Sequence, residues 1–157
     1  MKAAFDTNVL VYAEGINAPE QHLAAADLVQ ALHIREAALI PVQALGELYN
    51  VLLRKARWPT GRAQTAILAW RDAFPLAPTT PAAMLAAVEL AKDHGLRIWD
   101  SVMISVAVEN GCRLLLSEDL QDGFTWRGLS VVNPFARRRH PLLEALLASD
   151  VEGGGRC

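Results

Sequence analysis

Two short apolar runs, one at the start of the chain and one far along it, stop at or just before an aspartate. The first covers residues 1–5 and ends at Asp6, and the second covers residues 112–117 and leads to Asp119 in a turn-like segment. Short apolar runs bounded by turn signals are typical of buried strands. In open α/β sheets ligands bind outside the carboxyl ends of the strands, so we expect the two acids to meet in one crevice.

Strand-like runs alternate with stretches of helical periodicity along the chain. This alternation predicts an α/β fold in which helices flank a central, mostly parallel sheet. Strands are expected at residues 1–5, 36–41, 76–78, 112–117 and 129–132. Helices are expected from near residue 9 and at residues 19–34, 42–57, 61–73, 81–94, 98–110 and 141–149.

Composition favours one globular domain with an ample core, because 52% of the 157 residues are hydrophobic and only 20% are charged. The net charge of −2 provides no overall basic field for nucleic acid, although a local basic patch is compatible with it. Asp6 and Asn8 interrupt the N-terminal apolar segment, and no run approaches the ~18 residues that span a bilayer. We therefore expect a soluble, cytoplasmic protein without a membrane segment.

Cysteine and histidine give no sign of a disulfide framework or a zinc site. The two cysteines are Cys112, in an expected strand, and Cys157, at the terminus. The four histidines show none of the spacings of zinc hydrolases. A reducing compartment fits this pattern.

Four carboxylates stand within or directly after apolar sequence, and each also has a structural explanation. Asp6 and Asp100 suit the cap or first turn of a helix, where free N–H groups and the helix dipole favour an acid. Asp119 suits a turn. Glu47 lies on a helical face that is largely apolar, and its structural alternative is a position at the boundary between buried and exposed surface.

Taken together, the four carboxylates indicate a particular function more specifically than any one of them does alone. Several acids in a partly buried crevice raise one another's pKa values unless a cation joins them. Oxygen ligands without Cys or His favour Mg²⁺ or Mn²⁺. The chemistry expected of such a site is phosphoryl transfer by metal-activated water, with a second ion about 4 Å away if both bind together.

The same residues carry a family resemblance. Residues 5–10 (FDTNVL), 46–48 (GEL), 99–101 (WDS) and 117–123 (SEDLQDG) look like the ordered motifs of PIN-domain ribonucleases. The chain most resembles the VapC toxins of bacterial toxin–antitoxin pairs, and the motif at 117–123 is the most specific. The resemblance implies a PIN-like nuclease domain over residues 1–133. It leaves residues 134–157 as a basic and helical tail that contains Arg137–Arg139, and its last residues are expected to be disordered.

The resemblance also implies a doubly wound sheet, frequent homodimers, an RNA substrate and a cognate antitoxin that inserts near the active groove. Ser117 stands where the wider family often has Thr, so the hydroxyl is retained. The implied metal-binding and catalytic acids are Asp6, Glu47, Asp100 and Asp119, with Asn8 and Ser117 as polar helpers and Asp122 as an optional addition.

The leading hypothesis is a VapC-type endoribonuclease dependent on Mg²⁺ or Mn²⁺. The alternative is a non-catalytic RNA- or protein-binding module on the same fold. An aspartyl-phosphate phosphatase similar to the haloacid dehalogenase group ranks last, because Asn8 stands where that group has its second Asp. Substrate choice would come from groove shape and scattered basic residues such as Arg54, Lys55, Arg57 and Arg97.

Overall fold

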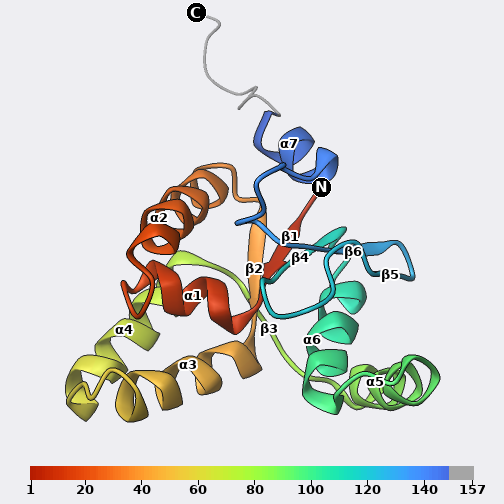
Figure 1. Ribbon diagram of the computed structural model, residues 1–157. Helices are drawn as coiled ribbons and strands as arrows, with labels where there is room; N and C mark the ends of the chain where they lie inside the picture. Colours follow the sequence, from red (N-terminus) through yellow and green to blue (C-terminus); the bar gives the residue numbers. More distant parts are fainter. Residues whose placement is uncertain (149–157) are drawn as a thin grey trace, which may run out of the picture.

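The computed structural model describes residues 1–148. Its centre is one sheet with the strand order β3-β2-β1-β4-β6-β5 (Figure 1). All neighbouring strands are parallel except the antiparallel pair of β5 and β6. The predicted α/β class with a mostly parallel sheet is therefore confirmed. The strands are β1 (Ala3–Phe5), β2 (Ala38–Pro41), β3 (Leu76–Ala77), β4 (Leu114–Leu116), β5 (Thr125–Trp126) and β6 (Leu129–Val132).

Helices cover both faces of this sheet. In Figure 1, α1 to α4 lie on one side of the strands, whereas α5 and α6 pair with each other on the other side. The helices are α1 (Thr7–Ala13), α2 (Pro19–Ile34), α3 (Val42–Arg54), α4 (Thr60–Ala73), α5 (Pro81–His94), α6 (Ile98–Glu109) and α7 (Pro141–Ala148).

Several predicted elements differ from the observed ones by one to three residues at an end, and two differences have a clear structural cause. Helix α3 ends at Arg54 instead of residue 57, because Arg57 adopts a left-handed φ of 56° and Pro59 follows. Strand β5 is not predicted by the apolar pattern. It forms a hairpin with β6 whose two turn residues, Arg127 and Gly128, both have positive φ, as the tight turn between twisted strands requires.

The two strands at the middle of the sheet are apolar throughout because helices cover both of their faces. Ala4 of β1 lies beside Leu39 on one side and Leu115 on the other, and the whole of β1 and β4 is buried. This packing fixes the carboxyl ends of β1 and β4 next to each other.

Part of the predicted C-terminal tail packs on the body of the protein. Leu143 and Leu146 of α7 are buried in the main core, and the Arg35 guanidinium donates to the carbonyl oxygen of Leu147 at 2.6 Å. The side chains of Arg137–Arg139 are exposed. The predicted disorder of the last residues, and Ser149 of the predicted last helix, lie outside the described residues. Within residues 1–148, no helix is both long enough and apolar enough to cross a membrane.

Candidate active site

The carboxyl ends of β1 and β4 bring the first aspartate and a serine together. Phe5 and Leu116 are partners in the sheet, so the residues that follow them, Asp6 and Ser117, leave the sheet side by side. The Ser117 hydroxyl donates to Asp6 Oδ2 at 2.7 Å, and both side chains are buried. A hydroxyl donor thus stabilises the charged form of a carboxylate that has little access to water.

The second oxygen of Asp6 caps helix α1. Its Oδ1 accepts from the backbone N–H of Thr7 at 2.8 Å, and Asp6 has the extended backbone of an N-cap residue. The capping explanation raised from the sequence is therefore correct, but it uses only one of the two oxygens. The other oxygen belongs to the polar network at the strand ends.

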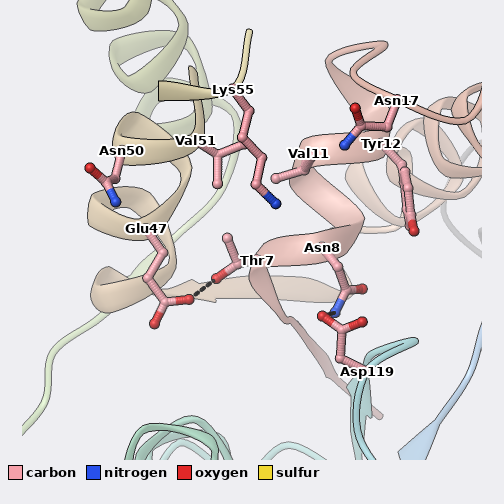
Figure 2. Close-up of a pocket in the computed structure, with 10 residues that line it drawn as sticks. All are labelled: Thr7, Asn8, Val11, Tyr12, Asn17, Glu47, Asn50, Val51, Lys55 and Asp119. Carbon is pink, nitrogen blue, oxygen red and sulfur yellow. Dashed lines mark hydrogen bonds between the residues drawn. The ribbon is translucent and has the colours of Figure 1, made fainter. Parts of the chain in front are cut away.

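Asn8 connects this pair to the second aspartate. Its Nδ2 lies 3.2 Å from Ser117 Oγ, 3.3 Å from Asp119 Oδ2 and 3.4 Å from Asp6 Oδ2. Its Oδ1 accepts from the N–H of Glu118 at 3.1 Å. Figure 2 shows the amide of Asn8 facing Asp119. The predicted meeting of Asp6 and Asp119 is thus realised through an amide that fixes the loop after β4.

Glu47 reaches the same place from helix α3. The Thr7 hydroxyl donates to Glu47 Oε2 at 2.6 Å, a contact drawn in Figure 2, and Gln43 Nε2 donates to Oε1 at 2.7 Å. Gln43 lies one helical turn before Glu47, so the two side chains share a face. Both carboxylate oxygens are therefore held, one from α1 and one from α3.

Asp100 enters from the first turn of α6. Its Oδ2 lies 3.2 Å from Nε of Arg97, which is largely exposed. Burial raises the pKa of Asp100, the neighbouring guanidinium opposes that rise, and the charges of Glu47 and Asp119 add to it. Asp100 therefore feels two acids that come from two other elements.

The pKa of Asp6 is shifted further than that of Asp100. Burial is the main cause that raises its pKa from 3.8 to about 6, the hydrogen bonds from Ser117 and Thr7 lower it, and the charges of Glu47 and Asp100 raise it further. The electrostatic fields of acids from the end of β1, from α3, from α6 and from the loop after β4 thus overlap at the carboxyl ends of the strands. Such an excess of negative charge is the setting in which a cation is favoured.

The donor set fits a hard divalent cation, although the side chains do not form a closed cage. All four groups are carboxylates, the ligands that Mg²⁺ and Mn²⁺ prefer. Within the described part of the chain, no three His, Cys, Asp or Glu side chains stand close enough to hold an ion by themselves. Mg²⁺ commonly uses one or two carboxylates and keeps several waters, so a looser set of acids is compatible with it.

A polar hollow of about 400 Å³ opens beside these acids between α1 and α3 (Figure 2). Glu47 and Asp119 lie on its walls, and the amino group of Lys55 points into it. Of the four basic residues suggested from the sequence, Lys55 lines this space and Arg97 contacts Asp100. The full lining is Thr7, Asn8, Val11, Tyr12, Asn17, Glu47, Asn50, Val51, Lys55 and Asp119.

A comparison with known protein families covers both the fold and the strand ends that carry the acids. The family model of the PIN domain matches residues 3–122. The chain belongs to the PIN domain family. The match covers every element that supplies the four acids, and it ends before the β5–β6 hairpin.

Two solved structures share this PIN fold. A toxin–antitoxin complex from Klebsiella pneumoniae has a TM-score of 0.61 at 20% identity, over 85% of this chain and 98% of that chain. VapC20 of Mycobacterium tuberculosis, described as a toxin that cleaves the Sarcin-Ricin loop, has a TM-score of 0.60 at 18% identity, over 75% of this chain and 90% of that chain. A comparison with curated proteins gives no match. At such low identity the two structures establish the fold.

The remaining candidate, Asp122, has a different setting in the PIN domain. It is exposed, and its Oδ1 accepts from the N–H of Asn133 at 2.9 Å, which ties the loop after β4 to the end of β6. Sequence reasoning did not single out Thr7 and Gln43, the two donors to Glu47. The position of Gln43 one turn before Glu47 was the available signal for one of them.

The raised pKa of Asp6 predicts a pH-dependent stability in the absence of metal. Because the folded-state pKa lies above the unfolded value, this contribution is fully present below pH 3.8 and is lost as the pH rises through about 6. Lowering the pH from 7 to 5 in EDTA should therefore raise the free energy of unfolding by about 1 kcal/mol more in the parent than in Asp6→Asn. Urea unfolding at both pH values measures this difference, and equal pH dependence in the two proteins would contradict the proposed origin.

Proposed function

We propose that this PIN domain is an endoribonuclease that depends on Mg²⁺ or Mn²⁺ and acts as a VapC-type toxin. The observation that carries the proposal is the overlap of four carboxylate fields at the carboxyl ends of β1 and β4, beside a polar hollow that contains Lys55. Similar structures are those of a toxin–antitoxin complex and of an RNA-cleaving toxin, which supports the same assignment.

In this proposal Asp6, Glu47, Asp100 and Asp119 would hold the metal, in part through metal-bound waters, because no three of these described side chains stand close enough to bind an ion directly. A bound divalent ion supplies activation of water for attack on the phosphodiester and neutralises charge on the phosphoryl oxygens. The pKa of Asp6, about 6, leaves its carboxylate mostly charged and ready for a cation at pH 7. No nucleophile from the protein is required.

The other polar side chains position these acids. Ser117 and the Thr7 N–H orient the two oxygens of Asp6, and Asn8 fixes the loop that carries Asp119. The Lys55 ammonium in the polar hollow is placed to attract a backbone phosphate of the RNA. The chain therefore supplies a rigid acidic edge and a nearby cation for the substrate.

The partners in this proposal are an RNA substrate, a cognate antitoxin and a second copy of the chain in a homodimer, and the site of action is the cytoplasm. The overall charge of −2 means that attraction of RNA depends on local cations such as Lys55. Binding is therefore expected to weaken as salt concentration rises, because phosphate contacts release counterions.

The deciding experiment is cleavage of a mixed tRNA and rRNA pool by the purified protein with Mg²⁺ or Mn²⁺. Discrete fragments are expected with metal and should disappear with EDTA and in Asp119→Asn. The matched control is Asp93→Asn, an exposed acid on α5, which should cleave like the parent. If the protein binds RNA without metal and produces no fragments, the non-catalytic binding module is the correct assignment.

A further inference from the structure

A second space, here called the aromatic groove, lies on the other side of Glu47. It has a volume of about 670 Å³, and Glu47 and Asn50 line both this groove and the polar hollow. The complete lining is Gln43, Gly46, Glu47, Tyr49, Asn50 and Trp99. One wall is therefore helix α3 and the other is the start of α6.

Trp99 gives this groove its character. Trp99 is 57% exposed, and it directly precedes the partly buried first-turn acid Asp100. The flat face of an indole ring is a surface on which any nucleobase can stack. The ring is thus held next to the candidate reacting edge by the same helical turn that holds Asp100.

We propose that the aromatic groove binds one unpaired base of a single-stranded RNA substrate, stacked on Trp99. The inference rests on the proposed ribonuclease function, because it assigns the base next to the cleaved bond to this groove. The phosphate is then assigned to the polar hollow, where Lys55 points inward. Glu47, on the wall between the two spaces, separates the reacting phosphate from the recognised base.

The groove has the chemistry of a base site and lacks that of a phosphate site. The residues that line it include no Lys or Arg, whereas Gln43 and Asn50 carry amides that can donate to and accept from a base edge. Its volume lies within the range of about 300–1,000 Å³ of small-molecule sites, into which a single nucleoside fits.

A second copy of the chain is a weaker candidate for the occupant. Covering the groove with an apolar surface would remove water from the Glu47 carboxylate, which has no cation among the lining residues. A nucleobase that stacks on Trp99 leaves the groove open at its edge and leaves that carboxylate facing the polar hollow. The charge pattern therefore favours the base.

Gly46 provides a way to fill the groove without disturbing the fold. A Cβ added there meets no atom within 4 Å, and the residue lies inside helix α3. Gly46→Leu therefore introduces a side chain into the open space and replaces a poor helix former with a good one. Its melting temperature should equal or exceed that of the parent, so lost RNA recognition could not be attributed to unfolding.

The test measures cleavage kinetics and the nucleotide beside each cleavage site. Trp99→Ala and Gly46→Leu should raise KM roughly tenfold with kcat within about twofold, and should lose the parent's preference at that nucleotide. Trp99→Phe keeps an aromatic face and should restore both. Leu85→Ala is the matched control, because Leu85 is 71% exposed on α5 and does not line the groove.

Tryptophan fluorescence separates this inference from the proposed activity. A short single-stranded oligoribonucleotide in EDTA should quench the parent and leave Trp99→Phe unquenched. If the parent cleaves RNA but Trp99→Ala keeps the parent's KM and nucleotide preference, the base site is wrong and the nuclease assignment is unaffected. The same conclusion holds if the only effect of Trp99→Ala is the loss of a dimer. If the parent cleaves no RNA, the nuclease fails, and quenching through Trp99 alone then supports the base site while its absence refutes it.

Discussion

Asp6→Asn is expected to lower RNA cleavage at least about a hundredfold, because loss of residues that merely orient metal ligands already costs about 10–100-fold and this change removes a ligand itself. The same change should leave the protein as stable as the parent or more stable. Asn keeps one oxygen for the Thr7 N–H, its amide N–H can donate to the Ser117 hydroxyl oxygen, and it is as good an N-cap as Asp. The two properties should therefore move in opposite directions.

The gain in stability has an electrostatic cause. Holding Asp6 ionised at pH 7 costs about 3 kcal/mol, judged from the rise of its pKa from 3.8 to about 6. The neutral amide avoids most of that cost. Initial cleavage rates with Mn²⁺ and thermal melts in EDTA measure the two effects on one preparation. A lower melting temperature together with retained cleavage would mean that Asp6 serves the fold and has no part in the reaction.

Phe5→Ala is expected to destabilise the fold by about 3–5 kcal/mol, the usual cost of removing a large ring from a packed core. Phe5 is fully buried in β1, and its ring meets that of Phe74 edge to face with 5.2 Å between centroids. Urea unfolding measures the change. Leu23→Ala on α2, where Leu23 is 68% exposed, is the control and should stay within about 0.5 kcal/mol of the parent.

This second prediction also concerns the site. Phe5 is adjacent to Asp6 and pairs with Leu116, so a cavity at Phe5 loosens the strand end that aligns Asp6 with Ser117. Cleavage should fall even at temperatures where most of the variant is folded. Full activity in a folded but destabilised variant would show that the alignment tolerates a softened core.

Local sequence patterns were sufficient for the central architecture and for half of the acidic site. The buried strands before Asp6 and Asp119 are short apolar runs, and parallel pairing brings their ends together. Strand β5 was missed because two residues with a partly exposed pattern give no periodicity to detect. The predicted end of α3 lies too far along the chain, because the positive φ of Arg57 has no signal in the local sequence pattern.

The approach of Glu47 and Asp100 could not be derived from spacing. Both lie on helices, and their distance from Asp6 depends on how α3 and α6 pack on the two faces of the sheet. Family resemblance supplied those positions before any packing was known. The donors Thr7 and Gln43 became visible only with the packing, because a hydroxyl or amide acquires its role from the carboxylate it faces.

The hydrogen bonds that hold Asn8 against Ser117 and Asp119 join residues 109 and 111 positions apart, and β4 completes the centre of the sheet only by pairing with β1. Contacts between residues so distant in sequence form after their intervening chain is available. During synthesis on the ribosome, the growing polypeptide thus has no assembled acidic edge until Asp119 has emerged from the exit tunnel. Unfinished chains released before that point would be inactive, so translation past Asp119 is a requirement for any activity of this edge.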